Sequence, residues 1–434
     1  MQALNFSIII PNYNGKAFLK DCITSIEASG YPRASFEVVV VDNGSSDGSV
    51  DLIRKLSPGT RIISLECNTG FVNAINTGAT AARSEFLVFL NNDMRVSSGW
   101  LSAFATVISE KNADCVTGKI LSWDGQHVDF VEGILLFDGH ALQRKQGVPA
   151  SAVSGDTVRR TFIACGGNMA IRRSLFLKLG GFDPSFFAYT EDVDFSWRLN
   201  ASGGKIFFSP DAVVYHHHQG TSTGLGVYNR GFLYERNAFL NLYKNIDAPY
   251  FSTMLHAAWL TLMHRTREII SLNADAGAVF GQFPFSKPHD VPHPVLTSEI
   301  GRSARLRACL KNYGLLYTIG RLIEKVGALI QRKVTCEIPA LALPEIQLGH
   351  PHIISQMQAL WYILANWESF HQKRLVVQSQ RKVSDKELFG MFPLWVVTTY
   401  PGDGRLFASA SFRELLPADI QFNFADIQEV HGVS

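Results

Sequence analysis

Short apolar runs alternate with stretches of helical periodicity over the first hundred residues, and this alternation constrains the fold more than any other feature. The apolar runs are residues 6–10, 36–41, 62–65 and 86–90. After the first of them, apolar side chains recur at helical spacing, namely Leu19, Cys22, Ile23 and Ile26. Such an alternation is typical of β-α-β units around a parallel sheet. We therefore predict an α/β fold with a Rossmann-like, mostly parallel sheet and flanking helices.

The alternation stops after about residue 247, where longer stretches with helical periodicity take over. A chain of 434 residues has room for about two to four domains. We predict one domain over residues 1–246 and a mainly helical C-terminal region of unknown role over residues 247–434. The Pro-rich stretch 284–294 is expected to be a loop or linker.

The overall charge and the cysteines exclude several classes of protein. Forty Lys and Arg face 38 Asp and Glu, so a formal charge of +2 gives no field for gripping a phosphate backbone, and nucleic acid is not an expected partner. The six cysteines lack the paired spacing of zinc sites and are expected to be reduced thiols. No export signal precedes the first strand and no apolar run approaches about 18 residues, so we expect a cytoplasmic protein without membrane-spanning helices.

Polar clusters follow the four predicted strands at the point where each strand ends. These clusters are residues 12–14, 42–47, 68–70 and 91–93. In an open α/β sheet, ligands bind in the crevice outside the carboxyl ends of the strands. The four clusters therefore predict one site.

Two of these clusters carry carboxylates with distinct chemistry. Asp42 can accept hydrogen bonds from a base N–H or from ribose hydroxyls, although an Asx turn with a helix N-cap is the ordinary alternative. Tyr13 could stack on a base or simply pack. Asp93 follows Asn91 and Asn92 at the end of a buried strand, which suits a half-open Mg²⁺ or Mn²⁺ site, and a plain strand-terminal turn is its alternative.

The densest polar signal lies in residues 165–199. Glu191, Asp192 and Asp194 place three carboxylates within four residues. Such neighbours raise one another's pKa, which suits one of them to act as a base near neutral pH. The alternative for part of the cluster is a salt bridge between Asp194 and Arg198, four residues apart on a helix.

Three consecutive histidines, residues 216–218, end a later apolar run. Imidazole can ligate Mn²⁺-like ions, and it can bind phosphate when charged. Because side chains alternate along a strand, at most His216 and His218 share one side. A polar strand end without function is the alternative.

Taken in order, seven strings resemble the inverting GT-A glycosyltransferases of family 2, in particular their non-processive bacterial branch with rhamnosyltransferase-like enzymes. The strings are SIIIPNYNG, VVVVDNGSSDGS, NTGFVNAINTGA, FLVFLNND, GGNMAIRR, GGFDPSFFAYTEDVDFSWRL and RNAFLNLYKN. They cover about residues 5–246, and the ordered set is far more specific than any one member.

The resemblance implies a role for each matching residue. LNND falls on the family's Asp-x-Asp motif with Asn91 in place of the first Asp, and TED falls on the catalytic-base motif, with Asp192 as the base and Glu191 beside it. The implied donor site is Pro11, Tyr13, Asp42, Asn68, Asn76, Asn92 and Asp93. The implied ligands of a divalent cation, Mn²⁺ or Mg²⁺, are Asp93 and His216. The implied acceptor site is Gly167, Asn168, Trp197 and Arg198.

The function implied is inverting transfer of a single sugar from a nucleotide-diphosphate donor to a hydroxyl of a glycan or lipid-linked glycan, in cell-surface polysaccharide or glycoconjugate assembly. The chain lacks the Q-x-x-R-W motif of processive family members. A sugar-nucleotide pyrophosphorylase is one alternative, but PNYNG stands where its Gly-rich turn would be. A catalytically inactive nucleotide-sugar or glycan-binding protein is the other, and Asn91 favours it.

Residues 301–333 carry eight Lys and Arg against one Glu, interleaved with apolar residues at helical spacing. A basic amphipathic helix can lie on an anionic membrane surface. We therefore expect peripheral contact with the inner face of the cytoplasmic membrane, and ordinary packing against the catalytic domain is the alternative.

Overall fold

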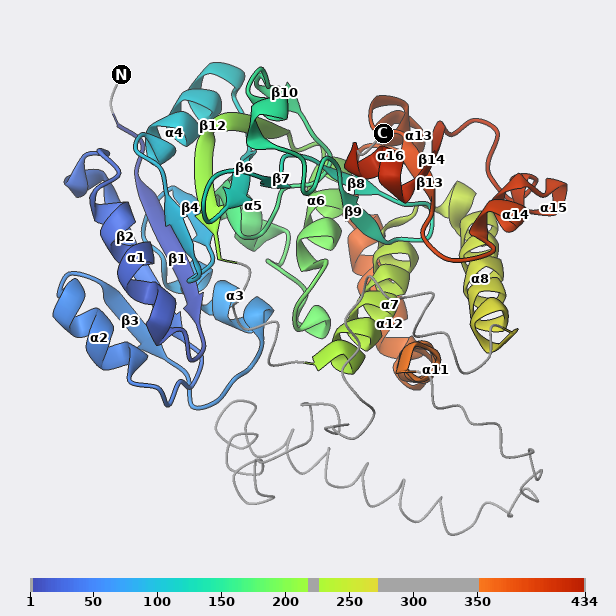
Figure 1. Ribbon diagram of the computed structural model, residues 1–434, viewed down its shortest axis with the longest axis horizontal. Helices are drawn as coiled ribbons and strands as arrows, with labels where there is room; N and C mark the ends of the chain where they lie inside the picture. The colour runs from blue at the N-terminus through green and yellow to red at the C-terminus, as the bar shows by residue number, and fades with distance from the viewer. Residues whose placement is uncertain (1–2, 218–225, 272–350, 433–434) are drawn as a thin grey trace, which may run out of the picture.

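The computed structural model describes residues 3–217, 226–271 and 351–432, and a ten-stranded sheet forms its N-terminal body (Figure 1). The strands are β1 (Phe6–Asn12), β2 (Phe36–Asp42), β3 (Arg61–Ser64), β4 (Phe86–Leu90), β5 (Met94–Val96), β6 (Cys115–Ser122), β7 (Val128–Phe130), β10 (Arg159–Arg160), β11 (Asn168–Arg172) and β12 (Ile206–His216). The four strands predicted from the apolar runs are therefore present.

The sheet is mixed, and most of its paired residues are parallel, as predicted; these pairs join β1 to β2 and β4, β2 to β3, and β6 to β12. Its order is β10-β12-β6-β11-β4-β1-β2-β3, with β5 paired to β12 and β7 paired to β6. The predicted strands β1 to β4 are parallel, but β11 runs antiparallel between β4 and β6. Because Asn168 lies opposite Leu90, β11 begins where β4 ends. The Gly166-Gly167 pair just before β11 consequently lies at the edge that carries the polar clusters.

Helices cover both faces of the sheet, as an α/β fold requires. They are α1 (Lys16–Glu27), α2 (Ser49–Leu56), α3 (Phe71–Ala81), α4 (Trp100–Lys111), α5 (Arg173–Lys178) and α6 (Glu191–Ala201). Alternate residues of β1 enter different cores, Ile8 and Ile10 on the side of α1 and α4, and Ile9 on the side of α3. Such a sheet, buried on both faces, explains the continuous apolar runs of the sequence. The buried side chains of α1 are the four predicted ones.

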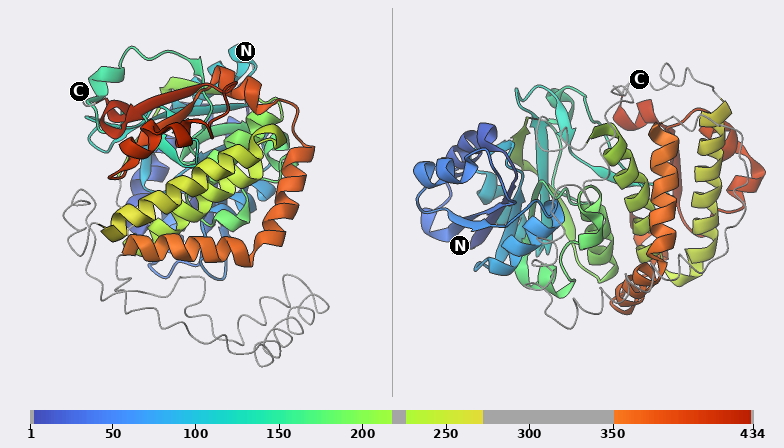
Figure 2. Two further views of the ribbon diagram at one scale, coloured as in Figure 1. Left: turned by 90° about the vertical axis from the view of Figure 1, so that its right-hand side faces the viewer. Right: turned by 90° about the horizontal axis from the view of Figure 1, so that it is seen from below.

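The described part of the C-terminal region is mainly helical, which confirms the prediction. It contains α8 (Ala248–Ser271), α11 (Pro351–Ala365), α12 (Trp367–Ser379), α13 (Asp385–Met391), α14 (Asp403–Ala408), α15 (Ala410–Arg413) and α16 (Ile427–His431). Helix α7 (Gly226–Asn245) precedes this region, at the end of the predicted N-terminal domain. Figure 2 shows α7, α8 and α11 as neighbours. No described helix is long and apolar enough to cross a membrane.

A small parallel sheet of β13 (Leu394–Thr398) and β14 (Phe422–Asp426) was not predicted. It meets the N-terminal body at the hairpin of β8 (Gly133–Leu135) and β9 (Ala141–Gln143), where Leu136 bridges to Trp395. Buried side chains of α6, α8, α13 and β13 also share one core. The division at residues 246 and 247 falls between α7 and α8 and stays a prediction.

Some sequence predictions concern residues that the structure does not describe. These are the Pro-rich stretch 284–294, the basic stretch 301–333, His218, Cys309 and Cys336. The four cysteines within the described residues are free thiols.

Candidate active site

Hydrogen bonds tie the carboxyl ends of three strands into one cluster. The parallel register places Asn12 of β1 beside Asp42 of β2, and the Asn12 amide donates to the Asp42 carboxylate at 3.0 Å. The other Asp42 oxygen accepts from the Ser45 backbone N–H at 3.2 Å. The Asn92 amide, after β4, donates to the Asn12 side-chain oxygen at 2.8 Å. The structure therefore brings together Asp42 and Asn92, as predicted from the strand ends, through Asn12, which lies in the predicted cluster 12–14 but was given no role of its own.

Asn43, which lies in the predicted cluster 42–47 but was given no role of its own, connects this cluster to residues 68–70. Its amide donates to the Asn68 side chain at 3.0 Å and to the Gly70 carbonyl at 3.1 Å. Gly70 has φ +91°, and a Cβ there would lie 2.6 Å from the ring of Phe187. The fourth predicted cluster thus lies beside the first three, and a glycine lets it approach the loop that precedes α6.

Other residues predicted for the donor site are Pro11, Tyr13 and Asn76, and their surroundings differ. Pro11 and Tyr13 are partly exposed beside buried Asn12. Asn76 on α3 uses both ends of its amide on Phe182, donating to its carbonyl at 2.7 Å and accepting from its N–H at 3.0 Å. Since these bonds hold α3 to the chain after α5, the Asn76 side chain has a structural partner and is not free to bind a ligand.

Asp93 lies in an ionic chain with His216 and Asp129. The His216 Nε2 atom is 3.3 Å from the Asp93 carboxylate, and the Nδ1 atom is 2.7 Å from the Asp129 carboxylate. Burial lowers the pKa of His216, but hydrogen bonds and charge from the two carboxylates outweigh burial and raise that pKa to about 9. Asp129, on β7, was not predicted because nothing in its local sequence points to a histidine 87 residues away.

The side chains near Asp93 fit a divalent cation. Asn91 has a buried amide oxygen without a hydrogen-bond partner, and oxygen ligands with an imidazole suit Mn²⁺ or Mg²⁺. The bond to Asp129 would orient the His216 ring, as second-layer carboxylates do in metal sites. Within the described ranges, no three His, Cys, Asp or Glu side chains could hold a metal ion by themselves. A cation here would therefore need Asn91 and oxygens of the substrate.

The proposed base lies at the first turn of α6. One Asp192 oxygen accepts from the Gly166 N–H at 2.9 Å, and the other accepts from the Val193 N–H at 2.9 Å. Burial raises the pKa of Asp192 although these N–H groups lower it. Burial and the charge of Asp192 raise the pKa of Glu191 well above its ordinary value, and one buried Glu191 oxygen has no hydrogen-bond partner.

The Gly166-Gly167 pair separates Asp192 from Asn91. A Cβ at Gly166 would lie 3.4 Å from the Cβ of Asp192, and a Cβ at Gly167 would lie 3.1 Å from the Asn91 amide nitrogen. The end of β4 and the N-terminus of α6 therefore meet across two glycine residues. This contact joins the metal-ligand candidates and the base candidate into one site.

Helix α7 holds the loop before α6 in place, a role that the sequence prediction did not assign. Phe187, Tyr189 and Thr190 have φ values of +64°, +66° and +58°. The Asn237 amide donates to the carbonyls of Ala188 at 2.9 Å and Tyr189 at 2.7 Å. The available signal was the string RNAFLNLYKN, which the resemblance matched without giving it a function.

Three of the four predicted acceptor-site residues are buried in structural contacts. Asn168 bonds the Trp100 indole at 2.9 Å, and the Trp197 indole donates to Asp385 at 2.9 Å. Arg198 is 2.8 Å from Asp194, so the salt-bridge interpretation of Asp194 is confirmed. The structure does not bring the side chains of Asn168, Trp197 and Arg198 to Asp192, and Gly167 alone remains at the site.

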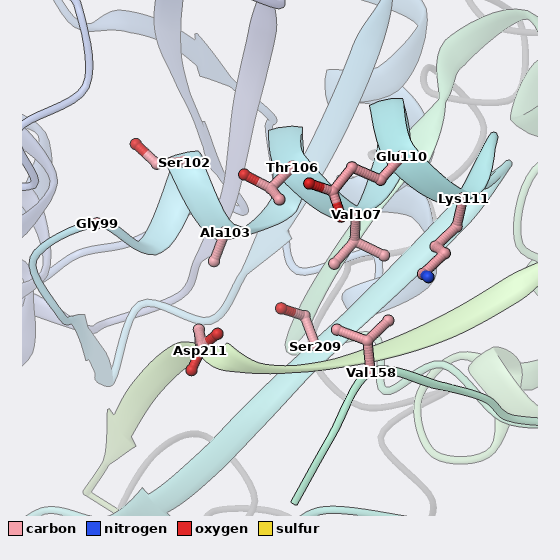
Figure 3. Close-up of a pocket in the computed structure, with 10 residues that line it drawn as sticks. All are labelled: Gly99, Ser102, Ala103, Thr106, Val107, Glu110, Lys111, Val158, Ser209 and Asp211. Carbon is pink, nitrogen blue, oxygen red and sulfur yellow. The ribbon is translucent and has the colours of Figure 1, made fainter.

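A hollow of about 280 Å³ lies elsewhere, between α4 and β12 (Figure 3). Polar groups around it come from Ser102, Thr106, Glu110, Lys111 and Asp211. No residue of the candidate active site lines it. It is therefore separate from the site described above.

Comparison with known proteins finds similarity in the N-terminal part of the chain. Residues 7–180 match the family Glycosyl transferase family 2. O-antigen biosynthesis protein RfbC of Myxococcus xanthus is 32% identical over 49% of this chain and 17% of its own length. Glycosyltransferase AglE of Haloferax volcanii is 26% identical over 48% of this chain and 66% of its own. The chain thus spans less than two thirds of either relative.

Solved structures with a similar fold include GalNAc-T7 with UDP, GalNAc and Mn²⁺, at a TM-score of 0.46 and 19% identity over 59% of this chain and 51% of that one. Another is Staphylococcus aureus TarS 1–349 in complex with UDP, at a TM-score of 0.43 and 18% identity over 82% of this chain and 90% of that one.

Proposed function

We propose that this chain transfers a single sugar from a nucleotide-diphosphate donor to a hydroxyl of a glycan or lipid-linked glycan, with inversion at the anomeric carbon. The match to Glycosyl transferase family 2 supports the reaction class. The observation that carries the proposal is the Gly166-Gly167 contact, in which a base candidate, Asp192, and a cation-ligand candidate, Asn91, approach two adjacent glycine residues. RfbC, named for O-antigen biosynthesis, supports a place in cell-surface polysaccharide or glycoconjugate assembly.

The strand-end cluster would hold the nucleoside diphosphate. Asp42 would accept hydrogen bonds from the base or ribose, and Pro11, Tyr13, Asn68 and Asn92 would line the same crevice. Asp93, Asn91 and His216 would hold Mn²⁺ or Mg²⁺. When bound, such a cation takes up negative charge on the departing nucleoside diphosphate.

Asp192 would take the proton of the acceptor hydroxyl. Its raised pKa brings it closer to neutrality, where a general base works best. Burial and the charge of Asp192 raise the pKa of Glu191 well above its ordinary value, so Asp192 is the better candidate for the base of the pair. A direct attack by the activated oxygen is a single displacement, and the product is therefore inverted.

The test is Asp192→Asn, which keeps the shape of the side chain but cannot accept the proton. A panel of nucleotide sugars first identifies the donor by released nucleoside diphosphate. Donor affinity should then survive in the variant while transfer falls by roughly 10²- to 10⁴-fold. Glu191→Gln should reduce transfer less. Full transfer by Asp192→Asn, or a product with retained configuration, would contradict this mechanism.

The second candidate is an inactive nucleotide-sugar or glycan-binding protein, which Asn91 favours because it replaces one expected carboxylate. Binding of a nucleotide sugar without any turnover would support it.

The rhamnosyltransferase-like branch, the cytoplasmic location and the contact of residues 301–333 with the inner face of the cytoplasmic membrane remain part of the proposal.

A further inference from the structure

Two tyrosines lie stacked beside the proposed base. The ring centroids of Tyr189, in the loop before α6, and Tyr234, on α7, are 4.9 Å apart at an interplanar angle of 24°. Tyr234 is 44% exposed, whereas the preceding α7 residues Phe232 and Leu233 are only 7% and 5% exposed. One face of the Tyr234 ring packs on Tyr189, so its exposed surface is open to a ligand.

The tyrosine pair is close to the reacting carboxylates. Asp192 is three positions after Tyr189, which is at most about 11 Å of chain. The Asn237 amide fixes the Tyr189 carbonyl at 2.7 Å. The exposed ring therefore belongs to the surroundings of the proposed base.

The two residues that follow Tyr189 in the chain have polar atoms without partners. Glu191 is 5% exposed, and one of its carboxyl oxygens has no hydrogen-bond partner. The buried Thr190 hydroxyl also lacks one. Because buried polar atoms are nearly always hydrogen-bonded, these two are candidates for bonds to a ligand. An aromatic face with polar groups at its edge suits a ligand that combines an apolar face with hydroxyl groups.

We infer that Tyr234, stacked on Tyr189, is the platform for a pyranose ring of the acceptor, which presents its hydroxyl to Asp192. A pyranose has a face of C–H groups that stacks on an aromatic ring and a rim of hydroxyls for Thr190 and Glu191. The inference rests on the proposed function and deepens it, since it specifies that the acceptor residue itself is a sugar ring. It also replaces the acceptor contacts expected from Trp197 and Arg198.

Saturation-transfer NMR tests the platform without requiring turnover. The probes are the methyl glycosides of glucose, galactose and rhamnose, and the variants are Tyr234→Ala and Tyr234→Phe. Phe424→Ala is a matched control, because Phe424 is 46% exposed on β14, outside the site. At least one glycoside should show saturation transfer in the wild-type protein, with a loss of about fivefold in Tyr234→Ala. Tyr234→Phe and Phe424→Ala should keep the signal.

The platform would be overturned if the saturation-transfer signal were undiminished in Tyr234→Ala. It would also be overturned if none of the three glycosides gave a signal in the wild-type protein. Nucleotide-sugar turnover is measured separately, so the two proposals can fail independently. Turnover with an unchanged acceptor KM in Tyr234→Ala removes the platform and leaves the transferase. A Tyr234-dependent glycoside signal without turnover of any nucleotide sugar supports the platform and removes the transferase.

Discussion

Lys244 of α7 offers the sharpest test of how the active-site scaffold is held. Its ammonium is 2.6 Å from Asp183 and 2.9 Å from Asp194, and its side chain is 2% exposed. Lys244→Met keeps the length of the side chain but removes the charge between two buried carboxylates. Breaking a buried ion pair by removing one partner costs about 3–5 kcal/mol. We expect the lower end, about 3 kcal/mol, because Arg198 still neutralises Asp194.

Lys373→Met is the matched control for this change. Lys373 pairs with the same Asp183 carboxylate, but its side chain is 32% exposed and it has no contact with Asp194. Exposed ion pairs contribute about 0–1 kcal/mol, because water screens them in both states. The same chemical change at Lys373 should therefore cost no more than about 1 kcal/mol.

Urea unfolding followed by circular dichroism measures both variants. The midpoint of the transition should fall clearly in Lys244→Met and little in Lys373→Met, with similar slopes, since a change in midpoint alone reports stability. Transfer activity should also fall in Lys244→Met, because Asp183 and Asp194 lie on either side of the loop before Asp192. The argument from burial would be refuted if the two variants lost equal unfolding free energy, or if Lys244→Met lost less than about 1 kcal/mol.

Two further predictions concern the ionic chain at Asp93. Asp93→Ala should remove most Mn²⁺- or Mg²⁺-dependent donor binding, and calorimetry that finds the same donor affinity with and without EDTA would place the cation elsewhere. The folded-state pKa of His216 is about 9 against 6.5 unfolded, so its stabilisation is complete below pH 6.5 and is lost as pH rises through about 9. That shift corresponds to about 3 kcal/mol. In EDTA, wild-type protein should lose about that much unfolding free energy between pH 6.5 and 9.5 relative to His216→Asn, and parallel pH profiles would contradict the assignment.

The sequence predicted the first strands and helix α1 well. Strand β4 has the predicted bounds, β1 and β2 extend past theirs by two residues and one residue, and α1 buries the predicted side chains. These elements are determined by apolar periodicity, which a single segment carries. The meeting of polar clusters at one edge was also predictable, because parallel strands place their carboxyl ends together. The antiparallel direction of β11 was not predictable, because it depends on where the chain returns to the sheet after a long connection.

The proximity of the candidate site residues was predicted where it follows from single strand ends, and their contacts were missed where a distant partner decides them. The resemblance implied that Trp197 belongs to the acceptor site, yet its indole donates to Asp385, 188 residues later. Asp129 was overlooked because its partner His216 is 87 residues away. A match to a motif therefore does not show which of its side chains face the ligand. Only the packing of α13 and β7 decides that for these two residues.

The loop before α6 shows why α7 belongs to the active site although its Asn237 is not expected to touch substrate. Non-glycine residues in the left-handed region cost on the order of 1–3 kcal/mol each, and this loop has three, at Phe187, Tyr189 and Thr190. An unsupported loop would relax toward ordinary φ values and turn the first residues of α6 away from Gly166. The Asn237 bonds to the Ala188 and Tyr189 carbonyls offset that tendency, because the relaxed loop would lose both. The position of the Asp192 carboxylate is therefore set jointly by the Gly166 N–H in front of it and by α7 behind the loop.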